Sequence, residues 1–156
     1  MCDEKFMTAA LELAREAAAD GEVPVGCVVV DTRGEIIGRG RNRREKNKTA
    51  SAHAELEAID EAGRALGDWR LDGCALYVTL EPCPMCAGAI INSRLSKLVY
   101  GAREPVSGAC GSVLNLFMEY GNAAAVTGGV LEPECRAVME EFFAKRRACG
   151  DAENGV

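Results

Sequence analysis

Two short stretches of the sequence contain side chains that could do chemistry together. His53-Ala54-Glu55 offers an imidazole and, two residues later, a carboxylate. Pro82-Cys83-Pro84-Met85-Cys86 offers two thiols separated by two residues. His53 is the only histidine of the chain, so a metal bound here has a single possible imidazole ligand. These residue types predict a metal site with one nitrogen and two sulfur ligands, a set that suits zinc.

The C-x-x-C pair alone fits three kinds of site. A redox dithiol of the thioredoxin type is one of them, but it leaves His53 and Glu55 without a role. A structural zinc site needs four protein ligands, and the fourth would have to come from Cys110 or Cys135. A catalytic zinc site has three protein ligands and keeps its fourth position for water. The three ligands that stand out favour the catalytic site.

Glu55 decides among these alternatives. On the first turn of a predicted helix, its carboxylate can reach a water in the open metal position without binding the metal itself. Two thiolates roughly cancel the charge of Zn²⁺, so a neighbouring base is needed to take a proton from that water. The alternative is a carboxylate that only complements the helix dipole, as Glu57 would. The combination with the cysteine pair argues against that alternative.

The surrounding pattern predicts an α/β fold, a three-layer α-β-α sandwich with a mixed five-stranded sheet. Apolar periodicity predicts helices over 4–20, 52–66, 83–92 and 132–147. Apolar and β-branched runs predict strands over 25–30, 35–41, 74–80, 97–101 and 125–130, with a basic loop at 42–51, a long connection at 102–111 and a short apolar turn at 113–118. The run 25–30 is uniformly apolar and should be buried on both faces. His53, Cys83 and Cys86 then lie at helix N-termini, where the helix dipole favours a thiolate.

Length and composition predict a single domain. The chain has 156 residues, of which 48% are hydrophobic and 27% charged, and we expect one domain over 1–156, with its core over about 4–147 and a frayed tail from Ala148. No apolar run is long enough to span a membrane, and the N-terminus lacks a signal-peptide pattern, so we expect a cytoplasmic protein. In a reducing cytosol the eight cysteines predict metal binding or burial, and Cys27 and Cys74 should lie in the core.

The charge distribution leaves a nucleic-acid partner open. A net charge of −6 argues against one, because phosphate contacts need clustered cations. Cations nevertheless gather in Arg39–Lys48, just before His53, and again in Lys145-Arg146-Arg147. A solvated loop and an ordinary helix C-terminus would explain the same two clusters.

The pattern H-x-E…P-C-x-x-C is the signature of zinc deaminases that act on cytosine or adenine, and His53, Glu55, Pro82, Cys83 and Cys86 match it. Over roughly residues 4–147 the chain also resembles the bacterial tRNA adenosine deaminases of the cytidine deaminase-like superfamily. The resemblance is carried by residues 21–26, 42–43, 52–55, 67–71, 76–91 and 99–103.

This resemblance implies a cytidine deaminase-like fold and one Zn²⁺ per subunit, held by His53, Cys83 and Cys86. It implies that Glu55 is the proton shuttle and that Asn42 binds the target base. The family acts as a homodimer on the wobble adenosine of a tRNA anticodon stem-loop and makes inosine. Further candidate substrate contacts are Val25, Arg43, Arg44, Arg103, Glu104, Phe143 and Arg146.

Two other functions fit parts of the pattern. A deaminase of a free base or nucleoside, such as guanine or cytosine, would use the same zinc site, and the acidic net charge favours it. A zinc-stabilised RNA-binding module without catalysis would leave Glu55 without a role. Aromatic residues make up only 5% of the chain, which is a poor basis for stacking on RNA bases.

Overall fold

A five-stranded mixed sheet forms the centre of the fold. The computed structural model of the chain describes residues 2–154, with the side chains of residues 3–150. The strands are β1 (Gly26–Val30), β2 (Ile36–Arg41), β3 (Ala75–Leu80), β4 (Lys97–Ala102) and β5 (Ala125–Thr127). They lie in the order β2-β1-β3-β4-β5. β1 pairs antiparallel with β2 and β3, whereas β3, β4 and β5 run parallel to one another.

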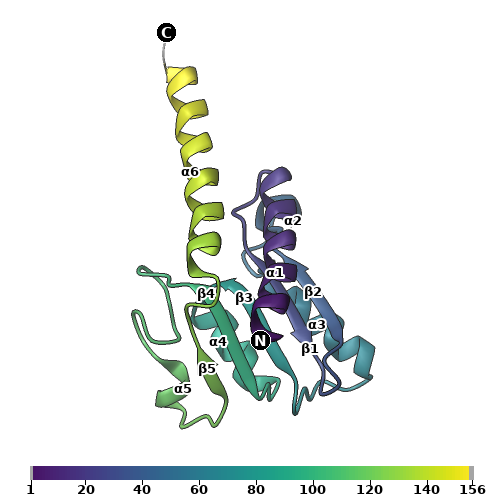
Figure 1. Cartoon of the computed structure of the whole chain (residues 1–156). Coiled ribbons are helices and arrows are strands. Elements are labelled where there is room, and N and C mark those ends of the chain that lie inside the picture. Colours follow the sequence, from purple (N-terminus) through teal and green to yellow (C-terminus); the bar gives the residue numbers. More distant parts are fainter. Residues whose placement is uncertain (1, 155–156) are drawn as a thin grey trace.

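Helices cover both faces of the sheet (Figure 1). α1 (Cys2–Ala19) and α6 (Glu132–Asn154) lie on one face, and α3 (Ala54–Leu66) and α4 (Pro84–Asn92) lie on the other. The two remaining helices are short: α2 (Arg44–Asn47) and α5 (Leu116–Glu119). The predicted three-layer α/β sandwich is therefore confirmed. None of the described helices has the length and apolar character that crossing a bilayer requires.

β1 shows why the sheet has two hydrophobic cores. All five of its residues are buried, as its uniform apolar sequence predicted. Side chains alternate between the faces of a strand, so Cys27 and Val29 belong to the core under α3 and α4, and Val28 and Val30 to the core under α1 and α6. The prediction that Cys27 and Cys74 are buried is also confirmed.

Gly40 sets how closely α3 approaches β2. A Cβ atom at this position would lie 2.0 Å from the carbonyl oxygen of Ala54, the first residue of α3. Because no real Cβ contact is that short, only glycine allows the helix to start directly on the strand. Because His53 directly precedes Ala54, this close approach places His53 near the C-terminal end of β2.

The structure differs from the sequence-based prediction at four elements. The basic segment 42–51, predicted to be a loop, contains α2, and the predicted apolar turn 113–118 contains the start of α5, with Phe117 buried. β5 has three residues instead of the six predicted. α6 continues to Asn154, so the predicted end at 147 and the predicted frayed tail from Ala148 are wrong as far as residue 154. A single glycine, Gly150, weakens a helix but does not end it. The last part of the predicted tail, 155–156, lies outside the described residues.

Candidate zinc site and catalytic pocket

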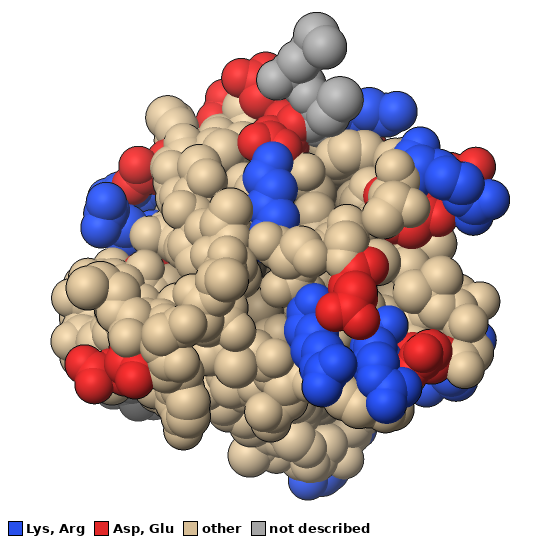
Figure 2. Space-filling model, turned by 90° about the horizontal axis from the view of Figure 1, so that it is seen from below, with Lys and Arg blue, Asp and Glu red and all other residues tan. Residues whose placement is uncertain are grey.

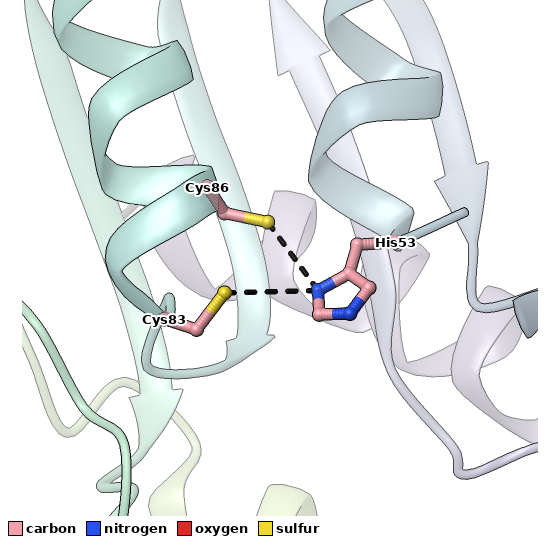
Figure 3. Close-up of side chains that lie close together, drawn as sticks. All are labelled: His53, Cys83 and Cys86. Carbon is pink, nitrogen blue, oxygen red and sulfur yellow. Dashed lines mark hydrogen bonds between the residues drawn. The ribbon is translucent and has the colours of Figure 1, made fainter. Parts of the chain in front are cut away.

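Two helix N-termini bring the three predicted metal ligands together (Figure 3). His53 is the N-cap residue of α3, Cys83 is the N-cap residue of α4, and Cys86 lies in the first turn of α4. The Nδ1 atom of His53 is 3.8 Å from Sγ of Cys83 and 3.4 Å from Sγ of Cys86. All three ligand atoms lie within 4.8 Å of one another.

These separations fit a zinc ion. Tetrahedral zinc has Zn–S bonds of about 2.3 Å and Zn–N bonds of about 2.0 Å, which puts nitrogen and sulfur ligands about 3.5 Å apart. Among the described residues this is the only group of three possible ligands. Cys110 and Cys135 do not belong to it: their sulfurs lie 3.9 and 4.0 Å from the backbone carbonyls of Pro82 and Val130. The group thus offers three possible protein ligands, the number that a catalytic zinc requires.

The electrostatics of the group favour a bound cation. Hydrogen bonding from Cys86, followed by that from His53, lowers the pKa of the Cys83 thiol to about 4. Sharing this proton with Cys83, together with burial, raises the pKa of Cys86. The lowered pKa of Cys83 favours its thiolate form, which is the form that coordinates zinc. By contrast, burial raises the pKa of Cys110 and of Cys135 to about 12, which keeps both as inert thiols.

Glu55 faces the same pocket as the ligands. Its side chain is buried, with 4% exposure, and it lines a cavity of about 140 Å³ whose wall also includes His53 and Cys83. Burial raises the pKa of the Glu55 carboxyl group. A carboxyl group with a raised pKa can both accept and return a proton near neutral pH.

The pocket contains some of the predicted substrate contacts and leaves others outside. Val25, Asn42, Arg44 and Glu104 line the cavity. Arg43 lies outside it and forms an ion pair with Glu57 at 3.0 Å. Arg103 is exposed and does not line the cavity.

Phe143 and Arg146 lie on α6, on the opposite face of the sheet from α3 and α4 (Figure 1). The Arg146 guanidinium stacks 5.5 Å from the ring centroid of Phe142, and Phe143 is 37% exposed. Both residues are therefore placed away from the cavity of this chain.

Sequence reasoning missed other pocket residues. The cavity is also lined by Val23, Ala54, Leu80, Glu81 and Ser107. Glu81 is fully buried and accepts hydrogen bonds from the Ser112 hydroxyl at 3.0 Å and from the Glu104 N–H at 3.4 Å. It thereby holds the segment that follows β4 against the pocket. No signal in the sequence marks this role, because the partners of Glu81 lie more than twenty residues later in the chain.

The fold and this site define an α/β domain in which three possible zinc ligands lie beside a buried carboxylate. The chain belongs to the family of the cytidine and deoxycytidylate deaminase zinc-binding region, whose sequence model matches residues 1–102. It is 50% identical, over 147 residues, to the tRNA-specific adenosine deaminase of Bacillus subtilis, covering 93% of this chain and 91% of that protein.

Solved structures show the same relationship. A structure from work on A-to-I editing by tRNA A34 deaminases at the wobble position superimposes with a TM-score of 0.82 and 43% identity, covering 86% of this chain and 98% of the other. Guanine deaminase from Nitrosomonas europaea superimposes with a TM-score of 0.79 and 32% identity, covering 90% and 84%. The zinc-binding region that the family model describes agrees with the ligand group of His53, Cys83 and Cys86.

Proposed function

We propose that this chain is a zinc-dependent hydrolase that converts adenosine to inosine at the wobble position of a tRNA anticodon loop, with release of ammonia. The observation that carries the reaction type is the position of the buried Glu55 carboxylate in the same small cavity as His53 and Cys83. The substrate is supported by the relative named for tRNA-specific adenosine deamination, which is half identical to this chain over nearly its whole length.

The three possible metal ligands and Glu55 have separate roles in this reaction. His53, Cys83 and Cys86 would hold the zinc ion, which when bound acidifies water and so provides a nucleophile at neutral pH. Glu55 takes a proton from the attacking water and delivers it to the departing 6-amino group. In balance, water adds at C6 of the adenine ring, the C6–N6 bond breaks, and inosine and ammonia are formed.

The cavity is small, about 140 Å³, so we infer that the base must leave its stack to enter it. An anticodon loop allows this at low cost, because its bases are already unpaired. Asn42 is the proposed partner of the base, and Val25 and Glu104 are proposed to contact the same nucleotide, since all three line the cavity. Arg44 lines the rim and is exposed, so it is placed to meet a phosphate.

A second candidate function is deamination of free guanine. It is favoured by the similarity to the Nitrosomonas europaea enzyme, although at 32% identity against 50% for the tRNA-specific relative. The experiment that separates the two offers zinc-loaded protein an anticodon stem-loop with adenosine at the wobble position, beside free guanine, cytosine and adenosine. Inosine in the stem-loop supports the tRNA function. Ammonia released only from a free base would replace it with the second function.

We also propose that the chain forms one domain over residues 1–156 and works as a homodimer. The dimer is supported by a groove between α3 and α4 in which Ile59, Trp69 and Ala89 lie beside polar and charged side chains. Trp69 is 55% exposed there. The polar and charged residues of the lining are Asp60, Arg64, Asp68, Asn92 and Ser93. Sedimentation of the purified protein tests the dimer. We further propose that the protein works in a reducing compartment such as the cytoplasm. The cysteines of the described residues form no disulfide and are mostly buried, which supports this proposal.

A further inference from the structure

The basic segment 42–51 beside the pocket contains the short helix α2, whose N-cap residue does not cap it. α2 spans only Arg44–Asn47, and its N-cap residue Arg43 makes no side-chain capping hydrogen bond. The first amides of any helix have no partner within the helix and need one from elsewhere. In α2 the first backbone hydrogen bond of the helical pattern is that of the Asn47 N–H, which donates to the carbonyl of Arg43 at 2.8 Å.

Glu22 supplies the missing partners. Its Oε1 accepts a hydrogen bond from the Glu45 N–H and its Oε2 accepts one from the Lys46 N–H, both at 2.9 Å. The Arg44 N–H donates to Oδ1 of Asn42 at 3.1 Å. The first three amides of α2 are thus all accepted by side chains, two of them by one carboxylate that lies more than twenty residues earlier in the chain.

The burial of Glu22 is unusual for a charged side chain. The side chain is 2% exposed, and burying a carboxylate is costly unless hydrogen bonds and a favourable dipole compensate for it. No part of the proposed reaction uses this carboxylate. The segment it ties down is the one in which Arg44, Lys46 and Lys48 are all exposed, and Arg44 also lines the pocket.

Further hydrogen bonds connect α2 to the wall of the pocket. Val23, the residue after Glu22, lines the cavity, and its carbonyl accepts a hydrogen bond from Nδ2 of Asn42 at 3.1 Å. Asn42 therefore bridges the wall and α2, while Glu22 holds the next two residues of α2. A shift of α2 would move Arg44 relative to the cavity in which the target base is proposed to lie.

We propose that Glu22 is a positioning residue for RNA: its carboxylate clamps α2 so that Arg44, Lys46 and Lys48 form a fixed cationic rim for phosphates next to the pocket. This inference rests on the proposed tRNA function. A rim fixed before binding does not have to be ordered when RNA arrives, so the clamp increases affinity without touching the substrate. The chemistry at Glu55 is unaffected by it.

The test uses Glu22→Gln, which keeps the size of the side chain but replaces one acceptor oxygen by an NH₂ group. Amide hydrogen exchange at Glu45 and Lys46 measures the clamp directly, with no reference to activity. We expect both amides to exchange faster, KM for the wobble-adenosine stem-loop to rise about tenfold, equivalent to about 1.4 kcal/mol, and kcat to change by less than about twofold. We also expect a shallower dependence of the stem-loop Kd on salt, because fewer phosphate contacts form in a fixed register.

Glu35→Gln is the matched control, because Glu35 is an exposed carboxylate in the turn at the opposite end of β2 from α2. It should change neither the exchange of the two amides nor KM. Glu22→Asp, which keeps the charge but shortens the side chain, should behave like Glu22→Gln and serves if that variant does not fold.

Three results would overturn the proposal. In the first, the two amides lose protection while KM and the salt dependence stay at wild-type values. In the second, kcat falls and KM does not change. In the third, neither Glu22 variant folds, which would make Glu22 a residue of the fold and not of the rim. Failure of the proposed function is recognised separately, since wild-type protein would then not deaminate the stem-loop at all.

Discussion

At the scale of single residues, the sequence pattern predicted the group of possible metal ligands, but it did not predict all the residues that line the pocket or support it. His53, Cys83 and Cys86 could be predicted because His53 is the only histidine and because the two short patterns H-x-E and P-C-x-x-C are rare, although they lie about thirty residues apart. Glu81 and Glu22 could not be assigned in this way, because their partners are backbone amides and a hydroxyl that only the folded chain brings near them. A carboxylate in a sequence gives no sign of being buried.

The three-ligand site predicts different outcomes for different cysteines. Cys83→Ala should abolish stoichiometric zinc binding, because two remaining ligands hold zinc weakly. Cys110→Ala should retain one zinc per chain, since the Cys110 sulfur contacts the carbonyl of Pro82 and lies outside the ligand group. Zinc content by atomic absorption after gel filtration measures both. Loss of zinc in Cys110→Ala would show that the site has a fourth protein ligand.

At the scale of elements, most helices and strands could be predicted because each has a strong apolar period. α2 could not, because it has four residues and its stability comes from the Glu22 carboxylate and not from its own sequence. α5 is equally short, although Asn115 caps it by accepting a hydrogen bond from the Met118 N–H at 3.2 Å. β5 is shorter than predicted because its pairing with β4 covers only three residues.

The close approach of α3 to β2 gives a prediction about Gly40. In Gly40→Ala the new methyl group would meet the carbonyl oxygen of Ala54, so α3 must shift. We expect the free energy of unfolding to fall by about 2 kcal/mol or more and zinc affinity to fall as well, since His53 moves with the helix. Denaturant unfolding and a zinc competition titration measure the two effects.

Gly150→Ala is the matched control for that variant. It makes the same change in α6, where nothing lies within 4 Å of the added Cβ. It should raise stability by up to about 1 kcal/mol, because alanine is the better helix former. Equal destabilisation by both variants would argue against a steric effect at Gly40.

The link between α1 and the sheet depends on pH. Asp3 accepts hydrogen bonds from Nζ of Lys97 and from the Tyr77 hydroxyl, both at 2.8 Å, and the Lys97 contact is the main reason that the pKa of Asp3 is lowered. A carboxyl group whose pKa is lower in the folded state stabilises the fold above its unfolded pKa, and this stabilisation is lost as the pH falls through the folded pKa.

Asp3→Asn should therefore lower the free energy of unfolding at pH 7 by about 0.5–1 kcal/mol, the value for a partly exposed ion pair. The difference should be smaller near pH 2, because protonation of Asp3 weakens its ion pair with Lys97. Urea unfolding at the two pH values, with Asp72→Asn as an exposed control, measures the difference. A deficit that is the same at both pH values would mean that the Lys97 ion pair contributes nothing.

At the scale of the whole molecule, net charge is a poor guide to the partner. The chain carries a net charge of −6, yet the segment next to the pocket exposes Arg44, Lys46 and Lys48. Figure 2 views the molecule from the end of the sheet where the β1–β2 turn lies, and there Lys and Arg lie beside Asp and Glu in several places. Neighbouring charges of opposite sign screen one another locally, whereas the segment 44–48 at the pocket carries three exposed cations and one exposed acid, Glu45, and so keeps a local positive charge.

The central claim is that Glu55 moves the proton in a zinc-dependent deamination of adenosine. The most direct test is single-turnover formation of inosine in a wobble-adenosine stem-loop by zinc-loaded wild-type protein and by Glu55→Gln, with zinc content and melting temperature measured on the same samples. The account predicts inosine with the wild type, and for Glu55→Gln an unchanged zinc content, an intact fold and a rate lower by a factor of about 10² to 10⁴. A zinc-loaded, folded Glu55→Gln variant that forms inosine at close to the wild-type rate would contradict it.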